Sequence, residues 1–178
     1  IENIDVGGPT MVRSAAKNYK DVTVITSSKQ YGELIEELGK NKGYTSLEFR
    51  EKLSRIAFTE TAYYDSVISD YFNKKTNIIF PKKRVFHANL VETPRYGENP
   101  HQKSAIYSKN SSMKINQIQG KQLSYNNYND IFSALTISKS LPKNIGTVII
   151  KHANPCGVSI NKDHLKSYKS ALACDPIS

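Results

Sequence analysis

Residues 146–157 read Gly-Thr-Val-Ile-Ile-Lys-His-Ala-Asn-Pro-Cys-Gly. The apolar, β-branched run at 147–150 predicts a buried strand, and the Asn-Pro and Cys-Gly pairs predict that it ends abruptly. A cation, Lys151, and a titratable imidazole, His152, therefore fall at the carboxyl end of a predicted parallel strand. Ligands of open α/β sheets bind at that edge. Position alone leaves an ordinary strand exit, without chemistry, as an equal alternative.

Further motifs accompany this segment. Residues 95–102 read Arg-Tyr-Gly-Glu-Asn-Pro-His-Gln, and residues 123–130 read Leu-Ser-Tyr-Asn-Asn-Tyr-Asn-Asp. The chain opens with Ile-Asp-Val-Gly-Gly-Pro at 4–9, soon followed by Ala-Ala-Lys-Asn at 15–18, and it ends in Ala-Cys-Asp-Pro at 173–176. Together and in this order, the motifs closely resemble the family of bifunctional purine biosynthesis enzymes that join an AICAR transformylase to an IMP cyclohydrolase. Any one motif alone would be a weak signal.

The resemblance runs from the first residue to the last and implies an α/β fold in two parts. Residues 1–80 resemble the C-terminal part of the cyclohydrolase domain, with a methylglyoxal-synthase-like fold and a linker. Residues 81–178 resemble the N-terminal part of the transformylase domain, which is similar to cytidine deaminases. The chain is therefore expected to straddle a domain junction and to complete neither site, so these residues alone are expected to be inactive.

The hydrophobic pattern predicts alternating helices and strands, which is typical of α/β units. Predicted helices span 9–18, a segment capped at 27–28 and running to about 40, 46–72, 130–141 and 163–174. Predicted strands span 21–26, 84–87, 104–107 and 147–151. The helix at 46–72 exceeds the usual length, which leaves a break open. Predicted inward-facing residues are Leu34, Ile35, Leu38, Leu53, Ile56, Ala57, Tyr64, Val67, Ile68, Tyr71, Ile131, Leu135 and Ile137.

Composition sets broad limits. The chain has 178 residues, which allows one or two domains, and its hydrophobic share of 38% is low for a compact domain. No apolar stretch is long enough to span a bilayer and no signal peptide is visible. Two cysteines, Cys156 and Cys174, do not make a disulfide framework, so we expect reduced thiols and a cytoplasmic protein.

The resemblance implies transfer of a formyl group from 10-formyltetrahydrofolate to the 5-amino group of AICAR. That amine is a poor nucleophile, and a neutral imidazole can accept its proton as attack proceeds. We therefore assign proton transfer to His152. A neighbouring ammonium disfavours a second positive charge and can stabilise the oxyanion that develops on the formyl carbon, which is the role of Lys151. Adjacent strand residues point to opposite faces, so both can serve one site only if the backbone turns here.

Three residues resemble the substrate-binding residues of the family. Arg95 can grip a phosphate with two hydrogen bonds, and Tyr96 can supply a hydroxyl or a stacking face. Asn127 can donate and accept at once, which suits the carboxamide of AICAR. Without the family context, Arg95-Tyr96 would indicate a turn beside a packed aromatic ring, and Asn126-Asn127 would indicate a turn.

The second activity implied by the resemblance is closure of formyl-AICAR to IMP with loss of water. Asp5 and Lys17 match the catalytic carboxylate and ammonium. Gly7 and Gly8 allow close approach of the backbone and open a helix N-terminus that can receive an anion. Taken alone, Asp5 would be a helix-entry residue and Gly-Gly-Pro a turn.

A zinc site is the alternative that the deaminase-like fold raises. His152, Cys156, His164 and Cys174 are the residues that could be nominated as ligands. Zinc deaminases need a Glu two residues after the His and a second Cys three residues after the first. Here residue 154 is Asn and that second cysteine is missing, so we expect no catalytic metal.

The resemblance implies AICAR, formyl-AICAR, IMP and folate as ligands, and a homodimer, without nucleic acid or membrane partners. The rival classes are a basic nucleic-acid-binding module and a regulatory or scaffold fragment that binds nucleotide without turnover. The formal charge of +9, from 25 Lys and Arg against 16 Asp and Glu, and the 11 tyrosines prompt the first. The lysines are dispersed, however, and such a field would also attract small anionic substrates.

Overall fold

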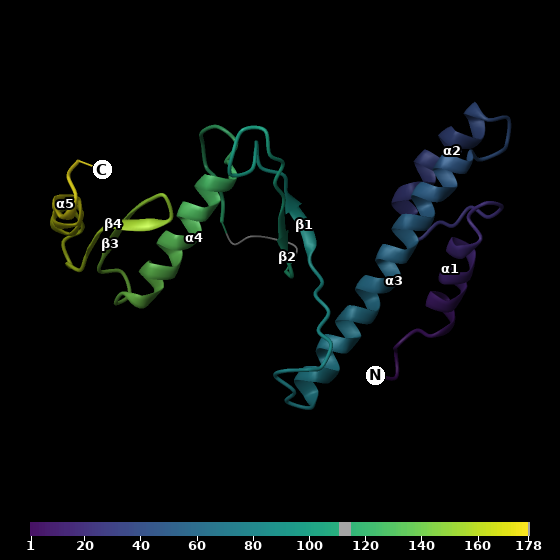
Figure 1. Cartoon of the computed structure of the whole chain (residues 1–178), viewed down its shortest axis with the longest axis horizontal. Coiled ribbons are helices and arrows are strands. Elements are labelled where there is room, and N and C mark those ends of the chain that lie inside the picture. The colour runs from purple at the N-terminus through teal and green to yellow at the C-terminus, as the bar shows by residue number, and fades with distance from the viewer. Residues whose placement is uncertain (111–114, 178) are drawn as a thin grey trace. The chain divides into compact units, whose positions relative to one another are not determined.

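The computed structural model describes residues 1–110 and 115–177. The chain divides into two compact units, residues 1–87 and 88–178. The described elements are, in order, α1 Gly7–Lys17, η1 Ser28–Gln30, α2 Tyr31–Lys40, α3 Leu47–Lys75, β1 Asn89–Glu92, β2 Ile106–Ser108, α4 Tyr125–Ser140, β3 Thr147–Lys151, β4 Asn154–Ser159 and α5 His164–Cys174 (Figure 1). This mixture of helices and strands confirms the α/β class, while the assignment of 1–80 and 81–178 to two named domains stays a prediction.

The long helix α3 is continuous over 29 residues, so no break occurs in it. Ser46 caps its N-terminus, where the hydroxyl accepts a hydrogen bond from the Phe49 N–H at 3.2 Å. The prediction of a helix at 46–72 is confirmed, with three more residues at its C-terminal end. No helix in the described part of the chain is long and apolar enough to cross a membrane.

The core of the first unit forms where α1 lies along α3 (Figure 1). Ala16, Leu53 and Ala57 are completely buried there, and Val24 and Phe49 complete the cluster. The small alanine side chains let the two helices approach closely, and the Ser54 hydroxyl donates a hydrogen bond to the Ala16 carbonyl at 2.7 Å. This buried polar contact is satisfied, so it costs little.

Several predicted inward positions are wrong. Ile35 is 69% exposed, and Val67 and Tyr71 on α3 are 41% and 49% exposed. Leu135 on α4 is exposed as well. For Val67 and Tyr71 the cause is length, since α1 has 11 residues and can cover only part of the 29-residue α3. Periodicity identifies an apolar face but not the segment that covers it.

Two predicted strands are wrong. Residues 21–26 join no sheet, although Val24 is buried in the core and Thr26 donates its N–H to the Gln30 side chain at 2.9 Å. Residues 84–87 are not a strand either, and β1 begins two residues later at Asn89. Residues 21–26 are rich in β-branched side chains and residues 84–87 contain Val85-Phe86, but a strand also needs a neighbouring backbone to pair with.

Each sheet of the second unit has two antiparallel strands. β1 pairs with β2, near the strand predicted at 104–107, and β3 pairs with β4. The strand predicted at 147–151 is confirmed as β3, but its predicted parallel pairing is wrong. The sequence predicted that Asn154-Pro155 and Cys156-Gly157 only stop the strand. In the structure β3 ends at Lys151, and these four residues belong to the next strand, β4. Pro155 is tolerated because it lies at an irregularity, where Ile149 pairs with Gly157 and Ile150 pairs with Pro155.

Helix α4 begins at Tyr125, five residues before the predicted start at 130. Its N-terminus is a capping box between Ser124 and Asn127, a signal that the predicted start did not take into account. The final helix is confirmed as α5, where the Asp163 carboxylate accepts hydrogen bonds from the N–H groups of Leu165 and Lys166 at 2.9 and 3.2 Å. Both helices therefore begin where a side chain satisfies free backbone donors.

Helix α5 packs directly on β4 at Gly157. A Cβ atom at this position would overlap the Ala171 carbonyl oxygen and lie 2.7 Å from its carbon. Beside this contact, the buried Ser167 hydroxyl donates to the Ser159 carbonyl at 3.2 Å. Gly157 thus has a packing role, because only a residue without a side chain lets helix and strand backbones touch.

We expect Gly157→Ala to destabilise the protein by about 1–3 kcal/mol, because the added methyl group must push α5 away from β4. Gly39→Ala is the matched control, since a Cβ at Gly39 in α2 meets nothing within 4 Å. That variant should gain about 0.5–1 kcal/mol from helix propensity. Urea unfolding of the variants and the wild type measures both effects. A Gly157→Ala protein as stable as Gly39→Ala would contradict the packing argument.

Candidate active site

The turn between β3 and β4 carries the two predicted catalytic residues. Lys151 is the last residue of β3 and pairs with Asn154, so His152 and Ala153 form a two-residue loop. His152 and Ala153 have positive φ angles of 53° and 61°. The backbone therefore turns immediately after Lys151, and the condition under which Lys151 and His152 can serve one site is met. Both side chains are exposed.

This turn is strained. A left-handed conformation costs a residue other than glycine about 1–2 kcal/mol, and two-residue hairpins with positive φ at both positions prefer Asn-Gly or Gly-Gly. His-Ala lacks that preference, so other contacts must hold the conformation. The Asn154 side-chain amide donates to the His152 carbonyl at 2.8 Å, and the Ala153 N–H donates to Asp130 Oδ1 at 2.7 Å. Backbone strain of this kind is concentrated at functional sites.

The Arg95-Tyr96 segment is tied to the start of α4. The Arg95 N–H donates to the Leu123 carbonyl at 3.1 Å, and the Tyr125 N–H donates to the Tyr96 carbonyl at 3.2 Å. The Arg95 guanidinium lies over the Tyr96 ring, 5.2 Å from its centroid. The exposed cation is thus held beside an aromatic face, an arrangement that suits a phosphate on an aromatic heterocycle.

A cavity of about 560 Å³ adjoins this segment. Gly97, Glu98, Lys103 and Tyr125 are among the residues that line it. Its volume lies within the range of small-molecule sites. The Asn126 amide donates to the Glu98 carbonyl at 3.0 Å, so one wall of the cavity is also anchored to α4.

Asn127 is committed in part to its own helix. Its Oδ1 atom accepts hydrogen bonds from the Ser124 N–H and hydroxyl, each at 3.0 Å. The oxygen is therefore used by the capping box, and Nδ2 is the side-chain atom left to serve a ligand. The sequence predicted that the Asn127 amide both donates to and accepts from a ligand. With Oδ1 used in the capping box, donation from Nδ2 is the part of this prediction that we retain.

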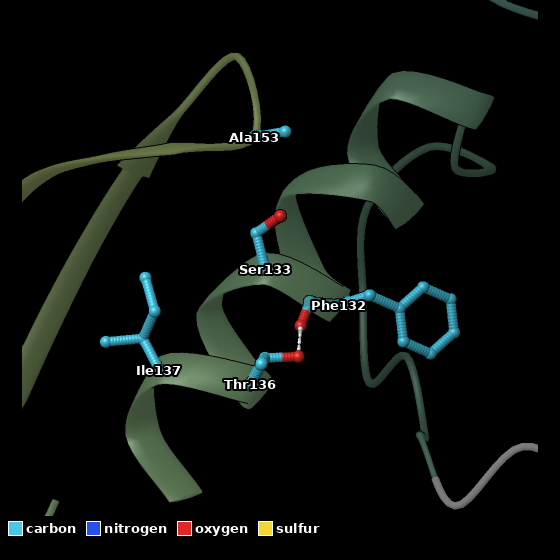
Figure 2. Close-up of a pocket in the computed structure, with 5 residues that line it drawn as sticks. All are labelled: Phe132, Ser133, Thr136, Ile137 and Ala153. Atoms are coloured by element: carbon cyan, nitrogen blue, oxygen red, sulfur yellow. Dashed lines mark hydrogen bonds between the residues drawn. The ribbon is translucent and has the colours of Figure 1, made fainter. Parts of the chain in front are cut away.

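The first two turns of α4 collect these residues. Asn127 and Asp130 are three residues apart on the helix and share one face. Arg95-Tyr96 is bound at the helix start, and the Lys151-His152 turn is bound at Asp130. Figure 2 shows Ala153 at the hairpin tip near Ser133, with a cavity of about 330 Å³ between the hairpin and α4. The Thr136 hydroxyl on its wall is turned back to the Phe132 carbonyl at 2.8 Å.

The predicted cyclohydrolase residues behave differently. Asp5 Oδ1 accepts a hydrogen bond from the Gly8 N–H at 2.9 Å, and the Asp5 N–H donates to the Tyr64 hydroxyl at 2.8 Å. Asp5, Gly8 and Tyr64 line a cavity of about 610 Å³, with Glu60 on its wall. Lys17 lies at the other end of α1, an 11-residue helix with a length of about 16 Å. The structure therefore does not bring Asp5 and Lys17 together.

The two glycines of the opening motif differ. A Cβ at Gly8 would overlap the Asp5 carboxylate and lie 3.0 Å from its Cγ, whereas a Cβ at Gly7 meets nothing within 4 Å. Gly8 therefore leaves room for the Asp5 carboxylate and Gly7 has no such steric role, while the predicted role of both glycines in binding the substrate stays a prediction.

Sequence patterns missed three residues at these sites. Tyr64 was predicted only as a packing residue of α3, yet its hydroxyl holds the backbone at Asp5. Asp130 lies inside a quoted motif, but nothing in the sequence shows that it reaches Ala153, 23 residues away. Glu60 had no sequence signal and is placed at the cavity by the register of α3.

No group of three or more His, Cys, Asp or Glu side chains within residues 1–110 and 115–177 is placed to hold a metal ion. Cys156 in β4 is half-buried and Cys174 at the end of α5 is exposed, and both are free thiols. That no catalytic metal is needed stays a prediction.

A buried contact joins β1 to α4. The Tyr128 hydroxyl donates a hydrogen bond to the Glu92 carboxylate, and the Tyr128 side chain is only 6% exposed. Burial, together with the hydrogen bond and the negative charge of Glu92, raises the pKa of Tyr128 to about 12. This contact fixes the strand that leads into Arg95 against the helix that carries Asn127.

Residues 15–178 match the AICARFT/IMPCHase bienzyme family, so the chain belongs to this family of two-activity enzymes and the predicted resemblance is confirmed. The "Bifunctional purine biosynthesis protein PurH" of Bradyrhizobium diazoefficiens is 44% identical over the whole chain. The proteins of the same name from Rhizobium rhizogenes and Persephonella marina are 45% and 47% identical over the whole chain. The chain spans about a third of these relatives, namely 35%, 34% and 36% of their lengths.

We expect Gly8→Ala to be less stable than Gly7→Ala by about 0.5–2 kcal/mol, the usual worth of a capping hydrogen bond. Both variants gain the same helix propensity, but only the first displaces the Asp5 carboxylate from the Gly8 N–H. Urea unfolding gives the difference. Equal unfolding free energies would mean that the Asp5 contact contributes nothing.

The raised pKa of Tyr128 predicts a loss of stability at high pH. The folded state holds this proton more tightly than the unfolded state, whose tyrosine pKa is 10.0. The stabilisation is therefore complete below pH 10 and is lost between about pH 10 and 12, with a slope of about 1 kcal/mol per pH unit. Tyr128→Phe should remove this part of the slope, measured by urea unfolding across that range.

Tyr125→Phe is the matched control, because it removes a hydroxyl exposed on the same helix that does not bond Glu92. If Tyr128→Phe and Tyr125→Phe had the same slope above pH 10, the Glu92–Tyr128 contact would not be the cause.

Proposed function

We propose that the protein carrying this chain is a bifunctional enzyme of de novo purine biosynthesis. It transfers a formyl group from 10-formyltetrahydrofolate to AICAR and then closes formyl-AICAR to IMP with loss of water. Membership of the AICARFT/IMPCHase bienzyme family supports the proposal. The observation that carries it is the gathering of Arg95, Asn127 and the Lys151-His152 turn on the first two turns of α4. Because the chain spans about a third of its relatives, both activities belong to the natural-length protein.

The proposed formyl transfer uses one polar group for each part of the substrate. Arg95 binds the phosphate of AICAR, and Asn127 Nδ2 donates to its carboxamide oxygen. His152 accepts the proton of the attacking amine, and Lys151 stabilises the negative oxygen on the formyl carbon. The exposure of Lys151 and His152 on a two-residue turn supports these roles, since a substrate can reach both side chains.

The proposed ring closure centres on the cavity beside Asp5. Gly8 occupies Oδ1 of this carboxylate, which leaves Oδ2 to move a proton as the carboxamide nitrogen attacks the formyl carbonyl. Because α1 separates Lys17 from Asp5, we assign to Lys17 the attraction of the anionic substrate rather than contact with the same reacting atoms. The Gly7-Gly8 segment at the start of α1 would bind an anionic group of the substrate.

The finer architecture and the assembly belong to the same proposal. The first unit would be the end of a methylglyoxal-synthase-like cyclohydrolase domain, and the second the start of a cytidine-deaminase-like transformylase domain. A folate donor, a homodimer and a cytoplasmic location complete it, without nucleic acid or membrane partners. The nucleic-acid alternative rests on the net positive charge of the sequence alone, and that charge is dispersed along the chain.

The natural-length protein, incubated with AICAR and 10-formyltetrahydrofolate, should produce IMP, resolved by chromatography of the nucleotides. We expect His152→Ala to lower formyl transfer by about 10²–10⁴-fold, the usual worth of a positioned acid or base, while AICAR still binds. His164→Ala is the matched control, because it removes an exposed imidazole at the start of α5.

The products separate the two activities. Accumulation of formyl-AICAR without IMP would support Lys151 and His152 and contradict the roles of Asp5 and Lys17. Unchanged AICAR from folded wild-type protein would contradict the enzyme proposal. Equal losses in His152→Ala and His164→Ala would show that His152 has no special role.

A further inference from the structure

We propose that Asp130 is a positioning residue for formyl transfer, and that its carboxylate fixes the Lys151-His152 turn against α4 through the Ala153 N–H. This inference rests on the proposed function of the same site. The hydrogen bond that Asp130 makes here goes to the backbone of the turn and not to the side chain of Lys151 or His152. It acts through the backbone that carries Lys151 and His152.

The turn needs an external contact because its own sequence does not favour its shape. His152 and Ala153 both adopt left-handed backbone angles that side-chain-bearing residues rarely adopt. The Asn154–His152 hydrogen bond lies within the hairpin and moves with it. In the part of the chain that the structure describes, the Asp130 contact is the hydrogen bond that joins the loop backbone to another element.

The contact is strong for its kind. The Ala153 nitrogen lies 2.7 Å from Asp130 Oδ1, in a partly buried setting. A carboxylate acceptor makes such a bond about twice as strong as a neutral one. Packing gives less support, because a cavity of about 330 Å³ is lined by Ala153 and by residues of α4. Figure 2 shows Ser133 and Ile137 on the side of α4 that faces the hairpin, whereas the Phe132 ring points away from it.

The same helix sets the position of a proposed substrate-binding group. Asn127 and Asp130 lie on one face of α4, about one turn apart. The capping box fixes the first of these and the helix fixes the spacing to the second. Asp130 therefore places His152 at a set distance from the amide that binds AICAR, so that the amine and its base approach in one geometry.

The first test measures hydrogen exchange of the Ala153 amide in the natural-length protein by NMR. Asp130→Ala should lower its protection about tenfold or more, and Asp130→Asn should keep most of it, because an amide oxygen can accept the same hydrogen bond. Asp163→Ala is the matched control, since that carboxylate also accepts backbone N–H groups but at the start of α5. Undiminished protection in Asp130→Ala would overturn the inference.

The second test measures formyl transfer in the natural-length protein. We expect Asp130→Ala to lower kcat about 10–100-fold, as misplacement of a catalytic group does, with KM for AICAR changed less than about threefold. Asp130→Asn should restore kcat to within about threefold of the wild type. Equal losses of kcat in both variants would overturn the inference in favour of a role for the charge, and a rise in KM alone would overturn it in favour of binding.

The two tests separate failure of the inference from failure of the proposed function. If the wild type transfers no formyl group, the function fails, and loss of Ala153 protection in Asp130→Ala still decides whether Asp130 holds the turn. If the wild type is active and Asp130→Ala retains full kcat, the positioning role fails alone. Asp130→Asn keeps the tests decisive if Asp130→Ala does not fold.

Discussion

The hydrogen-bonded start of α4 is the constraint on which the second unit depends. Ser124 and Asn127 close the capping box, and the first six residues of the helix also bind the backbone at Tyr96 and Ala153. The Arg95 N–H donates to the carbonyl of Leu123, just before the helix. The 95–96 segment and the turn at 152–153, which are far apart in the chain, are thus both held by the start of α4. The contacts to Arg95, Tyr96 and Ala153 all use backbone atoms of these residues, so the path of the chain is fixed while their side chains stay available to a ligand. A helix N-terminus suits this task, because its first N–H groups need external partners.

Side-chain atoms that hold the backbone in place are no longer free to bind a ligand. Asn127 serves the capping box with its oxygen and keeps only its nitrogen for a substrate, while Asp130 spends one carboxylate oxygen on a strained turn. Gly157 and Gly8 are also part of quoted motifs, yet the first allows α5 to touch β4 and the second makes room for Asp5. The quoted motifs therefore contain two kinds of residue: those whose side chains can contact a ligand, and glycines that allow close packing of neighbouring atoms.

Local signals predicted much of the fold. The Ser46 cap and the helical period gave α3, Asp163 marked the start of α5, and the β-branched run gave β3. Predictions that depend on a distant partner failed. Residues 21–26 have no strand to pair with. The chain reverses direction after β3 because His152 and Ala153 adopt positive φ angles, which the residue types do not predict. The site followed the same division. Motifs predict roles for Arg95, Asn127 and His152, but only the fold shows that α1 separates Lys17 from Asp5 and that Asp130 reaches Ala153.

The placement of Asp130 differs from that of the aspartate in a Ser-His-Asp triad. There the carboxylate bonds the imidazole ring, orients it and stabilises its charged form. Here the carboxylate bonds the N–H of the next residue, and the hydrogen bond described for His152 uses its carbonyl oxygen. The Asp130 contact thus uses neither ring nitrogen of His152 and acts on the backbone that carries the ring. For His152, the proposed base, the Asp130 contact can therefore set position only through the backbone, whereas a triad aspartate, which bonds the Nδ1–H, also stabilises the protonated ring.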